Sequence, residues 1–233
     1  MFSTDNLPLN VPDRTLALTY DDGPGPRSIA IAEFLSEHGI RATFFVVGKH
    51  VREHRDVVSG VKKLGHLIAN HTDTHQFLSK LVPEPDKLTL EVMGADREIQ
   101  EFIGEGPFLL RAPGGEWCAG AAEILNRTEG LRKYYGPFNW DIEFGDYEIG
   151  SPRNLKPGNP LYTLEQCQEN YLQGIRTRRC GVVLLHDWSA DSGDRGAELR
   201  RKNRTLELTK WLIPRLSDFR FVALDEISPI RAN

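Results

Sequence analysis

Two neighbouring carboxylates stand near the start of the chain, where "TYDDGP" places Asp21 and Asp22 directly after an apolar, β-favouring run at 14–20. Asp, Gly and Pro also occur where a strand enters a turn, so this stretch alone fits a plain loop as well as a functional site. Adjacent carboxylates allow two tasks on one turn, because one can bind a cation while the other accepts a proton. The remaining motifs must decide between these interpretations.

Two histidines stand four residues apart in "HTDTH", at His71 and His75. This spacing predicts that both imidazoles lie on one side of a helical turn, where one metal ion can bind both. Zinc hydrolases commonly use three protein ligands and keep a further position for water or substrate. One of the two aspartates would complete such a set, and its neighbour would be free to take a proton from the water.

A second pair with the same spacing, His50 and His54 in "HVREH", has no neighbouring pair of carboxylates. Arg52 and Arg55 lie close by in the sequence and would repel a divalent cation. We therefore interpret this second pair as solvated surface rather than as metal ligands.

Strand-like runs alternate with segments of helical periodicity along the chain. Strands are predicted at 14–20, 42–47, 66–70, 107–113, 133–142, 181–186 and 219–224, and helices at 28–40, 56–65, 88–104, 119–130, 164–178 and 205–216. About seven strand–helix units favour a parallel α/β architecture, a distorted (β/α)7-like barrel in a single domain over residues 1–233. The polar stretches 145–160 and 189–203 are predicted as long surface loops.

This architecture places the short motifs at one end of the barrel. In a parallel barrel the loops that follow the strands form one mouth, where functional groups gather. "TYDDGP" ends the first predicted strand, "NHTDTH" follows the third, "RAPGG" ends the fourth, "EFGDY" follows the fifth and "LLH" ends the sixth. Ordinary loop polarity does not require suitable side chains at five strand ends, so we expect one active site at this mouth.

The composition is that of an ordinary globular chain. Of the 233 residues 39% are hydrophobic and 27% charged, and the net charge of -4 gives no overall attraction to nucleic acid or an anionic membrane. No apolar run approaches the roughly 18 residues of a membrane span. No secretory leader opens the sequence, which leaves a cytoplasmic protein or a secreted one whose signal has been removed. Three scattered cysteines argue against a cysteine zinc site. We also expect the protein to be a monomer.

Together the five motifs resemble those of the NodB-homology polysaccharide deacetylases of carbohydrate esterase family 4. "TYDDGP", "HTDTH", "RAPGG", "EFGDY" and "LLH" follow in that family's order from Thr19 to His186. The resemblance implies a distorted (β/α) barrel and a metal-dependent hydrolase. Its substrate would be an acetylated glycan that contains N-acetylglucosamine, such as peptidoglycan or chitin, and its cofactor one divalent ion, Zn²⁺ or else Co²⁺ or Ni²⁺.

Carried over by position, the resemblance makes Asp22, His71 and His75 the metal ligands and Asp21 the general base. Arg111 would pair with the base and favour its ionised form. The metal would polarise both the water and the acetyl carbonyl.

The same resemblance makes His186 the general acid that protonates the departing amine, with Asp146 as its partner. The fourth motif departs from the family pattern, because Glu143 stands where an aspartate is more common and Tyr147 where a tryptophan is usual. Asp141 is therefore kept as an alternative partner for the acid.

The rest of the site is also inferred from the resemblance. The backbone N–H of Gly114 would bind the oxyanion, and Leu184 and Tyr147 would line the acetyl pocket. Three tryptophans near the mouth either stack on sugar rings or belong to the core: Trp117, Trp140 and Trp188.

Three other functions remain compatible with this sequence. The same barrel could remove O-acetyl groups from xylan or hydrolyse a small-molecule amide, because loops choose the substrate. A catalytically silent glycan-binding protein would be expected to lose the base, a metal ligand or the acid, and all of these residues are present.

Overall fold

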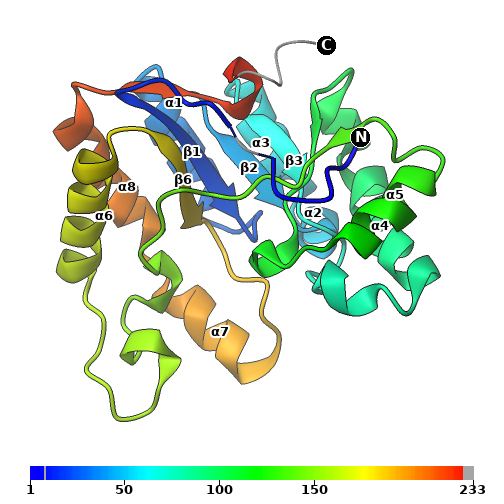
Figure 1. The fold of residues 1–233 in the computed structure, drawn as a ribbon. Coiled ribbons are helices and arrows are strands. Elements are labelled where there is room, and N and C mark those ends of the chain that lie inside the picture. Colours follow the sequence, from blue (N-terminus) through cyan, green and yellow to red (C-terminus); the bar gives the residue numbers. More distant parts are fainter. Residues whose placement is uncertain (8, 228–233) are drawn as a thin grey trace.

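The computed structural model describes residues 1–7 and 9–227, in which helices surround a parallel sheet (Figure 1). The strands are β1 (Thr15–Asp21), β2 (Thr43–Val46), β3 (Leu67–Asn70), β4 (Phe108–Leu109), β5 (Tyr134–Tyr135), β6 (Gly181–His186) and β7 (Arg220–Val222). The α-helices are α1 (Ser28–Glu37), α2 (Gly48–Glu53), α3 (Arg55–Lys63), α4 (Pro85–Ile103), α5 (Ala119–Arg127), α6 (Leu164–Arg178), α7 (Gly193–Lys202) and α8 (Thr205–Leu212). The alternating α/β pattern predicted from the sequence is confirmed.

The main sheet has the order β3-β2-β1-β6, and β7 pairs with the beginning of β1. All of these ladders are parallel. β4 and β5 form a separate ladder, which one bridge between Asn70 and Leu110 joins to β3. The segment after β5 then reaches β6, where Ile142 pairs with Val183. The barrel is therefore distorted, since isolated bridges rather than continuous strands connect part of its circumference.

Both faces of the central strand β1 are buried, as expected when helices cover a parallel sheet. Leu18 and Tyr20 belong to the cluster that packs against the helices, whereas Ala17 packs with side chains from neighbouring strands. Successive side chains of a strand point to opposite faces, so Thr19 and Asp21 share the inner face with Ala17. The strand thus directs one aspartate into the barrel.

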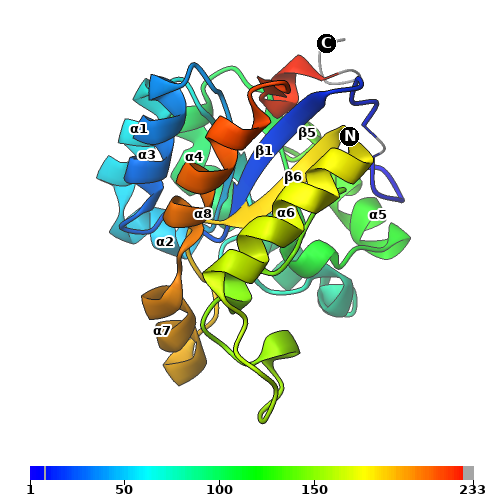
Figure 2. The same ribbon diagram turned by 90° about the vertical axis from the view of Figure 1, so that its left-hand side faces the viewer.

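The ladder register brings the ends of the central strands together. Asp21 is aligned with His186 of β6 on one side and with Phe45 of β2 on the other, and Asn70 at the end of β3 is aligned with Val46. Figures 1 and 2 show the helix α7 next to this edge of the sheet, on the side toward which the strand arrows point. The motif-bearing loops therefore share one edge, as predicted.

The helix α7 corrects the prediction of a loop over 189–203. Its ten residues are mostly charged or small, and only Gly196 and Leu199 among them are buried, so the segment lacks the apolar periodicity that marks a helix. The stretch 145–160 contains two short 3₁₀ turns and is otherwise irregular. All three cysteines are free, and none of the described helices combines the length and apolar character needed to cross a bilayer.

Candidate active site

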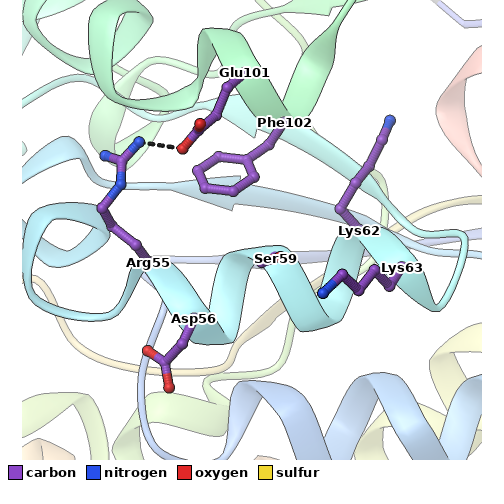
Figure 3. Close-up of a pocket in the computed structure, with 7 residues that line it drawn as sticks. All are labelled: Arg55, Asp56, Ser59, Lys62, Lys63, Glu101 and Phe102. Atoms are coloured by element: carbon purple, nitrogen blue, oxygen red, sulfur yellow. Dashed lines mark hydrogen bonds and ion pairs between the residues drawn. The ribbon is translucent and has the colours of Figure 1, made fainter.

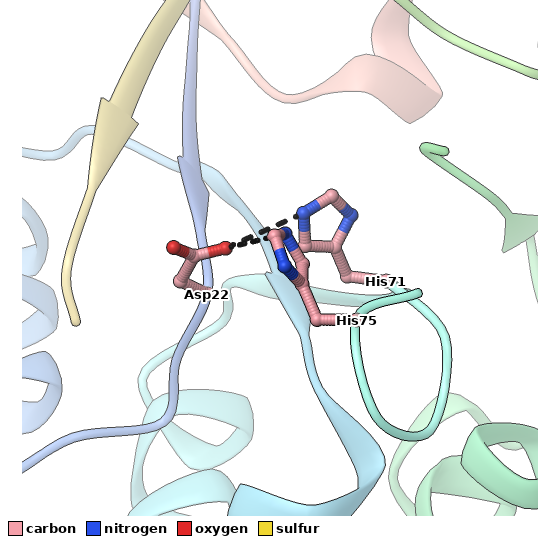
Figure 4. A group of neighbouring side chains, drawn as sticks. All are labelled: Asp22, His71 and His75. Atoms are coloured by element: carbon pink, nitrogen blue, oxygen red, sulfur yellow. Dashed lines mark ion pairs between the residues drawn. The ribbon is translucent and has the colours of Figure 1, made fainter. Parts of the chain in front are cut away.

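Asp22, His71 and His75 bring three potential metal-donor atoms within 4.8 Å of one another (Figure 4). The Nε2 atoms of His71 and His75 lie 3.5 and 3.2 Å from Oδ1 of Asp22. Burial opposes ionisation of Asp22, but the facing rings of His75 and His71 hold its pKa well below the usual range. One carboxylate and two imidazoles form a donor set that suits Zn²⁺. No other group of this kind occurs among residues 1–7 and 9–227.

A hydrogen bond at the ring nitrogen that faces away from Asp22 fixes the orientation of His71. Its Nδ1 donates to the backbone carbonyl of Arg111 over 2.9 Å, so Nε2 is the ring nitrogen that faces Asp22 and is left to bind a metal ion. Hydrogen bonds of this type set the tautomer of a metal-binding histidine and hold its ring in place.

The two histidines meet through a loop and not through a helical turn, so that part of the prediction is wrong. Residues 71–77 are irregular, and Thr72 and His75 both have left-handed backbone angles, with φ of 65°. The side chain of Asn70 accepts the N–H of Thr72, and the carboxylate of Glu91 accepts both the N–H and the hydroxyl of Thr74. These bonds replace the helical ones that the spacing suggested.

Asp21 is buried beside a buried cation. Nη1 of Arg111 donates to Oδ1 of Asp21 over 2.7 Å and to the hydroxyl of Thr19 over 2.8 Å. The guanidinium also lies 4.2 Å from the centre of the Phe45 ring. Oδ2 of Asp21 remains directed toward the metal-donor group, 3.6 Å from Nε2 of His71.

His186 lines the pocket and contacts Asp146 behind its wall. Nδ1 of His186 donates to Oδ1 of Asp146 over 2.8 Å, while Oδ2 accepts the backbone N–H of His186 and the hydroxyl of Thr205. Burial alone would lower the pKa of His186, but the negative charge and hydrogen bond of Asp146 outweigh it and raise the pKa to about 10. The ring is therefore charged at neutral pH.

The other two acidic candidates have different partners in the described part of the chain. Asp141 binds Arg178 and the N–H of Val182, at the opposite end of β6. Glu143 accepts the N–H of Gly145 and lines the pocket. Among the three acids, Asp146 is thus the one placed to support His186.

These groups open into a pocket of about 300 Å³ at the carboxyl edge of the sheet. It is lined by Asp21, Asp22, His71, His75, Phe77, Gly114, Trp140, Glu143, Tyr147, Leu184, His186, Ser189, Asp191, Arg195 and Leu199. Gly114, Tyr147 and Leu184 thus line the pocket, while Arg111 and Asp146 lie fully buried behind its wall. The Tyr147 ring meets the His186 ring edge-on, with centroids 5.0 Å apart.

Several lining residues were not identified from the sequence. Phe77 lies against Gly114, where an added Cβ would come within 2.9 Å of the phenyl ring. Asp191, Arg195 and Leu199 come from the α7 region, which the sequence analysis took for a loop. In "THQFLSK" the apolar Phe77 follows a run of polar residues just after His75, which was one weak signal for it. No local sequence pattern pointed to Asp191, Arg195 or Leu199.

The interpretation of His50 as solvated surface was also wrong. His50 is 6% exposed, and its Nδ1 donates to the backbone carbonyl of Asp22 over 2.8 Å. The exposed Arg52 on the same short helix forms an ion pair with Asp73 instead. Of the tryptophans, Trp140 lines the pocket, whereas Trp117 packs in the core near α5 and donates to Ser3.

A larger hollow of about 520 Å³ lies between α3 and α4 (Figure 3). Its wall includes Lys62 and Lys63, and it also contains an ion pair between Arg55 and Glu101. It holds no histidine or cysteine and no group of metal donors. We therefore take the smaller pocket, with its convergent titratable groups, as the candidate active site.

Comparison with known proteins identifies the family of this chain. The polysaccharide deacetylase family model matches residues 9–130. A chitooligosaccharide deacetylase from Rhizobium leguminosarum bv. trifolii is 37% identical over 182 residues, covering 75% of this chain and 72% of that protein. A peptidoglycan-N-acetylglucosamine deacetylase from Bacillus cereus is 31% identical over 170 residues, covering 73% of this chain and 58% of that protein. The chitin deacetylase structure from Colletotrichum lindemuthianum has the same fold, with a TM-score of 0.72 at 22% identity over 97% of this chain and 90% of that one. This chain belongs to the polysaccharide deacetylase family.

Proposed function

We propose that the protein is a metal-dependent N-deacetylase of glycans that contain N-acetylglucosamine. The observation that carries this proposal is the convergence of three units in one pocket: the metal-donor group, the pair of Asp21 with Arg111, and the pair of His186 with Asp146. A base and an acid on adjacent strands, with a cation site in the same pocket, suit hydrolysis of an amide.

The cation site has the donor chemistry that zinc prefers, and Co²⁺ or Ni²⁺ would fit the same two imidazoles and one carboxylate. A divalent ion held by Asp22, His71 and His75 would supply Lewis-acid polarisation of the acetyl carbonyl and of the attacking water. The first function of these side chains is therefore to hold the cation beside Asp21.

Asp21 acts as the general base. Its carboxylate receives a proton from the attacking water while the water oxygen forms a bond to the acetyl carbon. Arg111 donates to Oδ1 of this carboxylate and fixes its orientation, so Oδ2 is the oxygen free to take the proton. The carbonyl oxygen becomes an oxyanion, for which the backbone N–H of Gly114 is the proposed donor.

His186 acts as the general acid. The amine of an amide is a poor leaving group unless its nitrogen is protonated as the carbon–nitrogen bond breaks. The raised pKa of His186, caused mainly by Asp146 against the opposing effect of burial, keeps a proton on the ring at neutral pH. Transfer of this proton to nitrogen releases the free amine and acetate, while Tyr147 and Leu184 enclose the acetyl methyl group.

Mass spectrometry of a glycan panel tests the proposal. Zinc-loaded protein would be incubated with chitin oligosaccharides, peptidoglycan fragments, acetylated xylan and a small acetylated amide, with Asp21→Asn as the matched inactive control. Loss of acetyl from the first two substrates, absent in the control, supports the proposal. Loss from xylan alone assigns an O-deacetylase, and loss from the small amide alone assigns an amidohydrolase. Binding without acetyl loss from any substrate would indicate a silent glycan-binding protein.

A further inference from the structure

The segment from the end of β2 into α2, residues 47–50, contacts the loop that carries Asp22. The N–H of Val47 donates to the carbonyl of Gly23 over 2.8 Å. Nδ1 of His50 donates to the carbonyl of Asp22, also over 2.8 Å. One side chain and one backbone group thus bind successive carbonyls of the turn that presents this carboxylate.

The same segment contacts the loop that carries the two histidines. The N–H of Gly48 donates to the carbonyl of Thr72 over 3.0 Å, and the N–H of Lys49 donates to the carbonyl of Asp73 over 2.9 Å. The space beside Gly48 is closed, because an added Cβ would approach Oδ1 of Asp73 to 2.4 Å. Residues 47–50 therefore connect the two loops that supply the metal donors.

A third contact reaches the loop after β6. The ammonium group of Lys49 donates to the carbonyl of Ala190 over 2.8 Å, and the N–H of Ala190 donates to Oδ2 of Asp22 over 3.1 Å. This leaves Oδ1 of Asp22 as the oxygen that faces the two imidazoles. Both ends of Asp22, its carbonyl and one carboxylate oxygen, are thus held by contacts that lead back to the same short segment.

The backbone of Asp22 requires such support. Its φ of 73° lies in the left-handed region, which residues with a side chain rarely occupy unless the surroundings hold them there. His50 supplies the only side-chain hydrogen bond to the Asp22 backbone that the described residues show, and it does so from a buried position.

We propose that His50 is a positioning residue for the metal ligand Asp22, and that its Nδ1–H donor, rather than the bulk of its ring, sets the affinity of the site for a divalent cation. This proposal rests on the metal dependence in the proposed function. It concerns cation binding alone and needs no glycan substrate. Partners behind metal ligands commonly contribute about 10- to 100-fold to metal affinity.

Two substitutions separate the donor from the ring. His50→Asn keeps a nitrogen donor on the γ carbon and removes the ring, whereas His50→Phe keeps a ring and removes the donor. His54→Phe is the matched control, because His54 stands at the C-terminal end of the same helix α2 and makes no side-chain hydrogen bond to Asp22 in the part of the chain that the structure describes. The zinc dissociation constant of each untagged, metal-free protein would be measured by competition with a chromophoric chelator, at a temperature where circular dichroism shows all variants folded.

We expect His50→Phe to weaken zinc binding by about 10- to 100-fold, and His50→Asn and His54→Phe to remain within about threefold of the wild type. The reverse order of the two His50 variants, or equal affinities in both, would show a packing role and overturn the proposal. A wild type that binds no zinc would also overturn it. A wild type that binds zinc but deacetylates no glycan would refute the proposed function and leave this inference standing.

Discussion

The pair of His186 and Asp146 permits a prediction with a worked magnitude. In Asp146→Asn, the amide oxygen can still accept the N–H of His186 and the hydroxyl of Thr205, as Oδ2 does now. The amide nitrogen then faces Nδ1 of His186, where a donor replaces an acceptor. The neutral ring must therefore take the tautomer that has its lone pair on Nδ1, facing the amide, and its proton on Nε2.

The charge state of the ring follows from this change. Burial of His186 lowers its pKa, and the negative charge of Asp146 reverses that effect to reach about 10. With Asp146 neutral and a donor facing Nδ1, we expect the pKa of His186 to fall below its ordinary 6.5, a change of more than 3 units. Since the pKa of His186 is raised in the folded wild type, the protonated ring stabilises the folded state. This contribution is fully present below pH 6.5 and disappears as the pH rises through 10. That pH-dependent part amounts to about 5 kcal/mol.

Two measurements check this prediction. The Cε1–H resonance of His186 would be titrated by NMR in the metal-free wild type and in Asp146→Asn, and kcat/KM would be recorded on an acetamido sugar and on an activated aryl acetate. We expect the acetamido rate to fall by about 10²- to 10⁴-fold and the aryl acetate rate much less, because an activated ester needs little help from an acid. Titration midpoints within half a unit of each other, or equal losses on both substrates, would refute the assignment of His186 as the acid supported by Asp146.

Three further predictions concern the carboxylates and the cation around the pocket. Asp22→Asn should weaken zinc binding at least about 10-fold in a chelator competition. Asp21→Asn should bind zinc within about threefold of the wild type and lose turnover, because an amide cannot accept a proton. Equal loss of zinc in both variants would contradict the separate roles of Asp22 as metal ligand and Asp21 as base. Arg111→Leu should lower the free energy of unfolding by about 3 to 5 kcal/mol in urea titrations, because it leaves Asp21 buried without its cation, and an unchanged value would argue against that ion pair. Burial raises the pKa of Asp187 to about 7, so the unfolded chain releases this proton at lower pH than the folded protein does. Asp187 should therefore lower the free energy of unfolding of the metal-free wild type as the pH rises from about 4 to 7. Asp187→Asn should remove about 4 kcal/mol of that loss, and identical profiles of unfolding free energy against pH for both proteins would contradict it.

The sequence predicted most elements and the strand ends that carry the motifs, because both follow from local patterns. It missed the helices α2 and α7, and the strands predicted at 107–113 and 133–142 are shorter in the structure, as β4 and β5. Apolar runs and helical periodicity identified β1, β6 and most helices, and the parallel arrangement then placed the motifs at one edge. The pairing of Asp21 with His186 in one register depends on strand order, which no local pattern states. Family resemblance supplied the roles proposed for these residues, and the structure supplied their pairing.

The errors have a common physical origin in contacts between distant segments. His50 was judged by its sequence neighbours Arg52 and Arg55, yet those side chains form ion pairs with Asp73 and Glu98. His50 instead contacts a residue 28 positions earlier in the chain. The spacing of His71 and His75 suggested a helical turn, whereas their loop is shaped by bonds to Glu91 and Asn70. The polar helix α7 forms beside the pocket without an apolar stripe of its own.

Arg111 shows why a buried charge is kept in this fold. Its side chain is fully buried, and burial lowers its pKa although Asp21 opposes that effect. An apolar residue of similar volume often costs a protein no stability at such a position if both charges are replaced. Arg111, however, donates to Asp21 and Thr19 with its side chain and accepts from His71 with its own carbonyl, while its Nε is held by the carbonyl of Phe138. The side chain therefore fixes the proposed base, and an apolar replacement could reproduce its volume without that alignment. The bond from the proposed metal ligand His71 goes to the backbone carbonyl, which any residue at this position would offer.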